Sequence, residues 1–329
     1  MSDRYRPAEA NGGNIMKRVA ITGISGYIGN QLLQRLEQQE EVESIIGIDL
    51  RAPSSASPKL KFYPRDIREP FADVFADNQV DTAVHLAFVV NPTHDYVGAH
   101  RINIEGARNF LDACQQASVE CLFYLSSHTV YGPHPANPIP ITEDSPLRPI
   151  RSFPYSCDKA EVERMFQDFM ERHPDICVVI VRSCAVTGPK GGGAGLTILF
   201  TPVMIRPIGY DPPWQFVHED DLAELISTLL RQKQKGIFNV AGEGFLRYRE
   251  MIKAVGKPSI ALPAFLLSLL LTLSWQLHLQ SRASVGGLEF IKYPIVVSTE
   301  KLRETTGFQF RYSSREALMS LLENKRSTS

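Results

Sequence analysis

The sequence has no strong excess of charge of either sign. Its 35 Lys and Arg residues stand against 36 Asp and Glu residues, so the formal net charge of the 329-residue chain is −1. A near-neutral chain offers no electrostatic reason to bind nucleic acid or an anionic membrane. We therefore expect no nucleic-acid partner, and the length is sufficient for one large core or a core with a smaller lobe.

Cysteine is scarce and irregularly spaced. The five cysteines form no CxxC pair and no spacing typical of a metal site. An odd number of cysteines in apolar surroundings is typical of reduced thiols, so we expect a cytoplasmic protein. Residues 1–15 are polar and lack the apolar run of a signal peptide, so we interpret them as a disordered tail.

Strand-like and helix-like runs alternate in the first half of the chain. Strand-like runs occupy 18–24, 42–50, 82–90, 121–127 and 177–186, and helix-like runs occupy 27–39 and 103–117. Alternation of this kind predicts an α/β fold, a doubly wound parallel sheet with helices on both faces. The strand-like runs are apolar throughout, as expected when both faces of the sheet are buried.

Three glycines separate the first strand from the first helix. Gly23, Gly26 and Gly29 are three residues apart, and Asp49 ends the second strand 20 residues after Gly29. Glycines with this spacing permit a tight turn and a close approach of the backbone to a pyrophosphate. An acid at the end of the second strand accepts hydrogen bonds from ribose hydroxyls. A purely structural turn would also need glycine, but the whole context favours a Rossmann dinucleotide site.

Tyr155 and Lys159 lie four residues apart at the start of an amphipathic run. Residues with this spacing share one face of a helix. A cation beside a phenol stabilises the phenolate and lowers the pKa of the tyrosine, which would suit a proton acceptor near neutral pH. A surface tyrosine stacked over a lysine stem would explain the same pair, so the pair alone leaves both interpretations open.

Further motifs occur along the chain. They are TGISGYIG (22–29), RDIRE (65–69), VHLAF (84–88), NIEGARNFLDAC (103–114), LSSHTVYG (125–132), YSCDK (155–159), WQFVHEDDLAE (214–224), GIFNVAGEG (236–244) and a closing segment at 300–318. In combination and in order, these motifs resemble those of an extended short-chain dehydrogenase/reductase of the NAD-dependent epimerase/dehydratase family. The resemblance covers about residues 16–322.

The resemblance implies catalytic roles for four residues. Tyr155 would take a proton from a substrate hydroxyl as hydride passes to the nicotinamide, Ser127 would hydrogen-bond the same oxygen, and Lys159 would hold the nicotinamide ribose and lower the pKa of Tyr155. Asn103 would help to order a proton-relay water. The residues expected to bind the cofactor are Gly23, Ser25, Gly26, Tyr27, Ile28, Gly29, Asp49, Arg51, Asp66, Ile67, Leu86, Ala87, Tyr155 and Lys159.

We expect NAD rather than NADP as the cofactor. Asp49 would repel a 2′-phosphate and accept the free ribose hydroxyls, although Arg51 could hold that phosphate. Because members of the resembled family commonly dimerise through the helices that carry Asn103 and Tyr155, we expect a homodimer. The resemblance also divides the chain into a Rossmann domain, 16–186 plus 214–240, and a substrate-binding lobe, 187–213 plus 241–325.

The expected partner is a small-molecule substrate. Family members that act on nucleotide sugars usually carry RxxNVYGP, whose Asn helps to hold the diphosphate, whereas this chain has RSCAVTGP (182–189) with Ala185 at that position. We therefore predict an NAD-dependent oxidoreductase that transfers hydride between a secondary alcohol or ketone and the nicotinamide. A nucleotide-sugar epimerase that retains its NAD and a non-catalytic NAD-binding regulator stay as alternatives.

His218, Asp220 and Asp221 offer the side-chain types of a metal site. In the resembled family this segment orders the junction between the two parts of the chain. We therefore expect no metal.

A long apolar run at 258–281 contains no Asp, Glu, Lys or Arg. Its length would suit a membrane span, but Pro263 interrupts it and polar residues recur every four positions from Ser268. We expect an amphipathic helix whose apolar face covers the substrate cleft, and we leave open a weak contact with a membrane surface. The alternation LTLSWQLHLQ (271–280) would also fit a strand.

Overall fold

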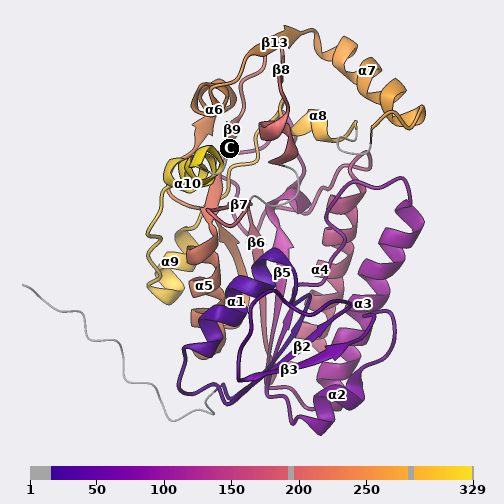
Figure 1. The fold of residues 1–329 in the computed structure, drawn as a ribbon, viewed down its shortest axis with the longest axis vertical. Helices are drawn as coiled ribbons and strands as arrows, with labels where there is room; N and C mark the ends of the chain where they lie inside the picture. Colours follow the sequence, from indigo (N-terminus) through magenta and orange to yellow (C-terminus); the bar gives the residue numbers. More distant parts are fainter. Residues whose placement is uncertain (1–15, 192–195, 281–284, 328–329) are drawn as a thin grey trace, which may run out of the picture.

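A seven-stranded parallel sheet forms the centre of the computed structural model, which describes residues 16–191, 196–280 and 285–327 (Figure 1). The tail predicted at 1–15 lies outside the described residues. The strand order is β11-β6-β5-β4-β1-β2-β3, which confirms the predicted Rossmann-type α/β sheet. The strands are β1 Arg18–Thr22, β2 Ser44–Asp49, β3 Leu60–Pro64, β4 Thr82–His85, β5 Cys121–Ser127, β6 Cys177–Ser183 and β11 Gly236–Val240.

The central strands are apolar because both of their faces are covered. Every residue of β6 is buried, and β4 is buried along its whole length. β3, by contrast, lies at one edge of the sheet and is only partly buried. Its residues, LKFYP, mix polar and apolar side chains, which explains why the apolar runs of the sequence did not reveal this strand.

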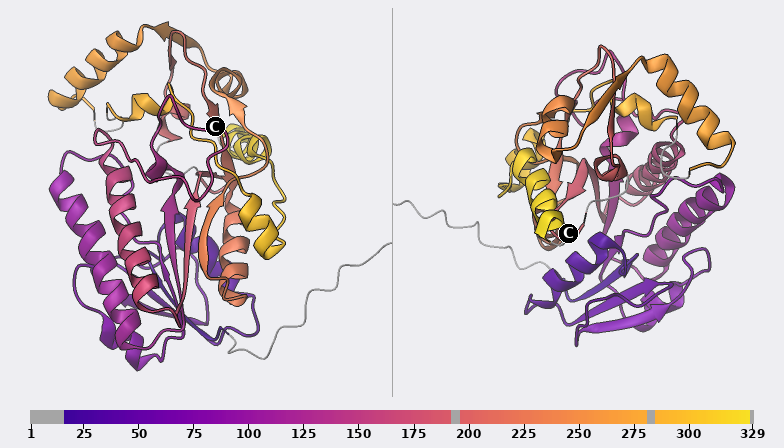
Figure 2. Two further views of the ribbon diagram at one scale, coloured as in Figure 1. Left: turned by 180° about the vertical axis from the view of Figure 1, so that it is seen from behind. Right: turned by 45° about the horizontal axis from the view of Figure 1, so that its top comes forward.

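Helices cover both faces of the sheet, as Figure 2 shows from two further directions. α1 and α5 pack against each other on one face, and α2, α3 and α4 pack on the other. Asp95 caps α3 by accepting a hydrogen bond from the Gly98 backbone N–H. The helices are α1 Tyr27–Glu37, α5 Glu219–Arg231, α2 Ala72–Asp77, α3 Tyr96–Gln116 and α4 Pro154–Arg172, with a 3₁₀ turn, η1, at His128–Tyr131.

A smaller part stands beyond the carboxyl ends of the sheet strands (Figure 1). It holds three two-stranded pairs, β10-β7, β12-β9 and β13-β8, and its own apolar core. Its elements are β7 Ala185–Thr187, η2 Leu196–Phe200, β8 Met204–Pro207, β9 Pro213–Trp214, β10 Phe216–His218, β12 Leu246–Arg247, α6 Tyr248–Val255, β13 Ser259–Leu262, α7 Ala264–Gln276, α8 Gly287–Phe290 and α10 Ser314–Ser327. α9 Glu300–Thr306 packs instead against β11 at the edge of the sheet.

In the apolar run near the C-terminus, β13 is followed by the helix α7, so the interpretation of residues 271–280 as a strand is wrong. The expected amphipathic helix is also only partly right, because Leu267 is the one buried residue of α7 while Leu269 and Leu273 on its other side are exposed. Within the described part of the chain, no helix combines the length and apolarity needed to cross a bilayer.

Candidate active site

A pocket of about 780 Å³ lies where the carboxyl ends of the sheet strands face the smaller part. This is the edge at which doubly wound sheets bind their ligands. The pocket is lined on one side by the glycine turn and the ends of the sheet strands, and on the other by β7, β8, β9, α7 and α8. Its volume is within the range of pockets that enclose small organic ligands and cofactors.

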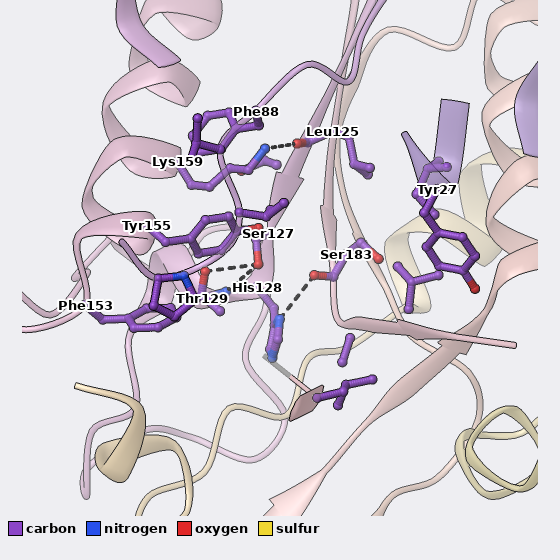
Figure 3. Close-up of a pocket in the computed structure, with 18 of the residues that line it drawn as sticks. Tyr27, Phe88, Leu125, Ser127, His128, Thr129, Phe153, Tyr155, Lys159 and Ser183 are labelled. Carbon is purple, nitrogen blue, oxygen red and sulfur yellow. Dashed lines mark hydrogen bonds between the residues drawn. The ribbon is translucent and has the colours of Figure 1, made fainter. Parts of the chain in front are cut away.

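Ser127 and Tyr155 meet in this pocket, as the sequence predicts. Ser127 ends β5, Tyr155 lies in the first turn of α4, and the Ser127 hydroxyl is near enough to the phenol to lower its pKa. Ser127 Oγ also accepts hydrogen bonds from the backbone N–H and the hydroxyl of Thr129, at 3.2 and 3.0 Å (Figure 3). Since Thr129 supplies both of these donors, the single Ser127 proton is left for another acceptor in the pocket.

Lys159 lies behind this pair and is buried, with 4% of its surface exposed. Its Nζ donates a hydrogen bond to the Leu125 carbonyl at 2.7 Å and lies 3.7 Å from the centre of the Phe88 ring (Figure 3). Burial lowers the pKa of Lys159 to about 7, an effect that the Glu163 carboxylate partly opposes. The contact with Phe88 was not anticipated from the sequence.

The expected lowering of the Tyr155 pKa is not found in this arrangement. Burial raises the pKa of Tyr155 to about 12, and the nearby Ser127 hydroxyl only partly offsets that rise. The Lys159 ammonium points to Leu125 and lies 5.9 Å from the centre of the Tyr155 ring. The phenol is therefore neutral near pH 7, and Ser127, rather than Lys159, is the neighbour that favours its ionised form.

Asn103 is not among the described residues that line the pocket. Its buried side chain accepts a hydrogen bond from the Val89 N–H at 2.8 Å and donates one to the Asp158 carboxylate at 2.8 Å. Asp158 precedes Lys159 on α4, so Asn103 ties the segment after β4 to the helix that carries Lys159. Both polar groups of the Asn103 side chain are therefore occupied by the protein itself.

The glycine turn is required by the close packing of the protein's own backbone. Gly23 has a φ of +74°, and a Cβ there would lie 2.5 Å from the Ala87 nitrogen. A Cβ on Gly29 would lie 2.3 Å from the Gly23 carbonyl oxygen. Without these glycines the turn could not pass beside Leu86 and Ala87, which follow β4 and line the pocket together with the turn.

Asp49 holds the glycine turn through one of its carboxylate oxygens. Its Oδ2 accepts a hydrogen bond from the Ser25 N–H at 3.1 Å, and its Oδ1 accepts one from the Leu50 N–H at 2.7 Å. A carboxylate has about four acceptor positions, so Asp49 keeps capacity for two ribose hydroxyls. Arg51 accepts a hydrogen bond at its carbonyl from the Ser25 hydroxyl and is not among the described lining residues.

Asp66 and Ile67 form the pocket wall next to the expected adenine position. Asp66 is held by Arg68, whose Nη2 lies 2.5 Å from Oδ2. The Arg68 guanidinium lowers the pKa of Asp66, so that carboxylate stays ionised. Arg65 and Arg68 also line this wall, and neither was predicted as a site residue.

Tyr27 and Ile28 begin α1 and line the pocket beside the glycine turn. The Tyr27 hydroxyl donates a hydrogen bond to Glu219 at the start of α5. Burial and this carboxylate raise the pKa of Tyr27. The contact fixes the first turn of α1 against α5, and the first-turn backbone N–H groups are the donors that bind a pyrophosphate in such folds.

The smaller part contributes an uncharged wall. Every described lining residue from Ala185 to Ile295 lacks a formal charge. The apolar and aromatic members of this wall include Val186, Leu196, Val203, Ile205, Trp214, Leu267, Leu271, Leu288, Phe290, Ile291 and Tyr293.

Arg182, the first residue of RSCAVTGP, is not among the described residues that line the pocket. It pairs with the buried Glu163 at 2.7 Å and also donates hydrogen bonds to the Tyr131 hydroxyl and the Glu143 carbonyl. These partners leave its guanidinium satisfied inside the protein. Among the described lining residues, the charged groups are Asp49, Arg65, Asp66, Arg68 and Lys159.

His128 is a polar group on the pocket wall. Its Nδ1 lies 3.1 Å from the Ser183 carbonyl (Figure 3), and burial lowers its pKa to about 4. Because a carbonyl only accepts hydrogen bonds, Nδ1 carries the proton and Nε2 of this neutral imidazole is an acceptor.

His218, Asp220 and Asp221 do not gather into a metal site. His218 caps α5 and stacks on Tyr312 with ring centres 3.8 Å apart, while Asp221 accepts hydrogen bonds from Arg311. In the described residues no group of three or more His, Cys, Asp or Glu side chains could hold a metal ion.

Sheet topology, glycine turn and Ser127–Tyr155 pair together define a dinucleotide-dependent enzyme of the short-chain dehydrogenase type. Residues 19–241 match the model of the NAD dependent epimerase/dehydratase family. The chain belongs to this family. The predicted family, its enzymatic character and NAD as the family's cofactor are thereby confirmed.

Curated relatives include proteins of different described activities. An uncharacterized protein of Mycobacterium tuberculosis is 29% identical over 309 residues, which cover 92% of this chain and 82% of that protein. A UDP-glucose 4-epimerase of Neisseria meningitidis is 29% identical over 51% of this chain and 52% of its own length. A 3 beta-hydroxysteroid dehydrogenase type 7 of Mus musculus is 30% identical over 53% of this chain and 50% of its own length.

Solved structures share the fold along almost the whole chain. The UDP-glucose 4-epimerase of Thermus thermophilus, in complex with NAD, has a TM-score of 0.74 at 22% identity and covers 95% of this chain and 100% of its own. The dTDP-glucose 4,6-dehydratase of Bacillus anthracis, in complex with NAD, has a TM-score of 0.71 at 16% identity, covering 95% and 97%. At these identities the likeness shows the fold.

The burial of Lys159 should make the stability of the protein depend on pH. In the folded protein its pKa is about 7, against an ordinary value of 10.5. Between those values the unfolded chain binds more protons, so the free energy of unfolding should rise with pH. We expect this rise in urea unfolding of the wild type and a flatter curve for Lys159→Met, whose side chain has no charge to titrate. Parallel curves for the two proteins would contradict the burial of a charge here.

Proposed function

We propose that the protein is an NAD-dependent oxidoreductase that transfers hydride between an apolar secondary alcohol or ketone and the nicotinamide. The observation that carries this proposal is the uncharged wall opposite Ser127 and Tyr155. A diphosphate bound there would meet no Arg or Lys from the described residues of the smaller part. Burying such an anion without a partner is costly, whereas an apolar ligand gains from the same surface.

The fit of the residues to the cofactor rests on three features of the sheet side. The glycine turn, the Asp49 carboxylate and the first turn of α1 would hold the pyrophosphate and the adenosine ribose. Asp66, Ile67, Leu86 and Ala87 would enclose the rest of the adenosine half. When bound, the cofactor supplies the hydride acceptor or donor, and the protein supplies position and field.

Tyr155 and Ser127 would act on the substrate oxygen. In the direction of reduction, the neutral phenol donates its proton to the ketone oxygen, in keeping with its pKa of about 12. Ser127 donates a second hydrogen bond to that oxygen, because Thr129 already supplies donors to Ser127 Oγ. In the direction of oxidation, the ionised form of Tyr155 takes the proton from the alcohol, and Ser127 is the neighbour that favours this form.

Lys159 and Asn103 would support the Ser127–Tyr155 pair, the first by binding the cofactor and the second by positioning α4. The Lys159 ammonium is within the pocket wall, where it would meet the nicotinamide ribose, and its stem is fixed by Leu125 and Phe88. Asn103 would position the start of α4 through Asp158, in place of the water-ordering role expected from the family. Its loss would act on the placement of Lys159 rather than on the substrate directly.

A nucleotide-sugar epimerase is the second candidate. The relatives named as UDP-glucose 4-epimerases favour it, and the hydroxysteroid dehydrogenase relative favours an apolar alcohol. Ala185 lies in the pocket wall where the nucleotide-sugar motif has Asn, and Arg182 is occupied by Glu163. These two features support the apolar substrate.

Substrate assays with a tyrosine variant test this proposal. We expect NAD-linked turnover of apolar cyclic secondary alcohols or their ketones, and no epimerisation of UDP-glucose. Tyr155→Phe should keep NAD binding and lower turnover at least about a hundredfold, because the proton donor is lost. Turnover is measured by nicotinamide absorbance, and cofactor binding by calorimetry.

Tyr63→Phe is the matched control, since Tyr63 lies on β3, away from the pocket, and accepts a hydrogen bond from Asn78. This variant should retain wild-type turnover. Near-normal activity of Tyr155→Phe would refute the assigned mechanism. Epimerisation of UDP-glucose by the wild type, with no turnover of apolar alcohols, would refute the substrate class.

Cofactor choice depends on Asp49. Because its carboxylate lies at the expected ribose position and Arg51 is not among the described lining residues, NAD should be preferred over NADP. Asp49→Ala should raise the ratio of NADP to NAD turnover, measured as kcat/KM for each cofactor. A wild type that already prefers NADP about tenfold or more would contradict this assignment.

A homodimer through α3 and α4 and a cytoplasmic location remain part of this proposal. α3 and α4 lie side by side on one face of the sheet (Figure 2), as the family's dimer helices would require.

A further inference from the structure

α7 presents apolar side chains on the face that points away from the protein. Phe265, Leu269 and Leu273 recur every four residues and therefore lie along one face of the helix. Their exposed fractions are 75%, 52% and 46%, and Leu270 beside them is also exposed. A surface helix normally turns charged and polar residues toward solvent. On α7, apolar residues occupy that outward position instead.

The opposite face of α7 packs against the rest of the protein. Leu267 and Leu271 line the pocket, and Trp275 stacks against His94 with ring centres 4.1 Å apart. Tyr96 also stacks on Trp275, and His94 lies 3.3 Å from the Gln280 carbonyl. The outward position of Phe265, Leu269 and Leu273 therefore follows from packing on the inner face of the helix.

Neighbouring strands extend the apolar surface. Ile260 of β13 pairs in register with Ile205 of β8, and both are exposed, as is Ile208 just after β8. Figure 1 shows β13, β8 and α7 together at the end of the molecule farthest from α2. We call Phe265, Leu269, Leu270, Leu273, Ile205, Ile208 and Ile260 the apolar end.

We propose that the apolar end rests on the surface of a lipid bilayer, with α7 lying in the plane of the interface. Several large apolar side chains exposed at one end of a molecule indicate an interaction site. α7 has 13 residues and no Asp, Glu, Lys or Arg, so at about 1.5 Å per residue it is too short to span a bilayer. The apolar side chains on its exposed face would instead enter the boundary between headgroups and acyl chains of one leaflet.

Two features favour lipid over a second copy of the chain. The polar residues of α7, Ser268 and Thr272 among them, are uncharged, and the Thr272 hydroxyl bonds to the Ser268 carbonyl within the helix. The exposed face of α7 therefore offers no charged group with which a second protein could form an ion pair. Moreover, α7 is also a wall of the pocket, so the surface that meets lipid is continuous with the site that binds the ligand.

Because α7 forms part of the pocket wall, contact with lipid would place the pocket next to the bilayer. An apolar alcohol or ketone dissolves in the bilayer, and a pocket wall held at the bilayer surface would take it up without passage through water. That step rests on the proposed function, whereas the lipid contact itself does not.

Flotation with vesicles of phosphatidylcholine tests the lipid contact. The full chain should float with these neutral vesicles, and added salt should leave binding unchanged, because α7 offers no charge for lipid headgroups. A double variant, Leu269→Asp with Leu273→Asp, should lower the vesicle partition coefficient at least about tenfold, since it removes two leucines from the face that meets lipid. Both residues lie outside the described pocket lining.

Phe245→Asp is the matched control, because Phe245 is 46% exposed, as Leu273 is, but lies outside α7, β8 and β13. It should bind vesicles as the wild type does, and NAD binding should be unchanged in all three proteins. Unchanged NAD binding would show that the substitutions leave the fold intact. Vesicle binding requires no turnover, so the lipid contact can be tested even if the proposed function is wrong.

Failure of the wild type to float would overturn the lipid contact. Binding confined to anionic vesicles and abolished by salt would also overturn it. If light scattering instead showed a dimer of the wild type that the double variant separates into monomers, the apolar end would be an interface between copies of the chain.

Discussion

The burial of one ammonium group organises the candidate active site. Lys159 Nζ is held between the Leu125 carbonyl of β5 and the Phe88 ring that follows β4. A buried cation is stable only where acceptors and a favourable field surround it, so the ends of two strands and the start of α4 must keep their mutual positions. Ser127 is two residues after Leu125 and Tyr155 is one helical turn before Lys159, so the same constraint brings these two hydroxyls together.

The pocket joins two surfaces of different chemistry. The wall formed by the sheet carries the charged residues and the glycine turn that suit a dinucleotide. The wall formed by the smaller part of the protein is uncharged at every described lining residue. Arg182 illustrates how the division arises, because Glu163 and Tyr131 retain its guanidinium within the core. Solved structures with this fold are named for nucleotide sugars, whereas the described wall of the smaller part here is uncharged, which is the basis of the proposed apolar substrate.

Local patterns in the sequence were sufficient for much of this arrangement. The apolar runs revealed five of the seven sheet strands, β11 lay within a motif of the resembled family, and the glycine spacing located the turn beside Asp49. Ser127 and Tyr155 could be paired because parallel strands and the helices after them meet at one edge of the sheet. β3 escaped notice because an edge strand needs fewer apolar residues.

What depends on packing between distant segments could not be predicted. The rise in the Tyr155 pKa follows from burial, and the rings that pack edge-on against Tyr155 are those of Phe88 and Phe153. Asn103 has both of its polar groups occupied by Val89 and Asp158, which only the fold brings near. In α7 the sequence showed apolarity, but the inner packing of Trp275 decides which side faces outward.

Titration calorimetry tests the central claim about the substrate most directly. The NAD-loaded protein is titrated with UDP in one experiment and with an apolar cyclic ketone in another. UDP carries the diphosphate of a nucleotide sugar without the sugar. With an uncharged wall opposite Ser127 and Tyr155, the ketone should bind saturably, and UDP should show no saturation up to about 1 mM. Saturable binding of UDP at about 10 μM or below, with none of the ketone, would contradict the account.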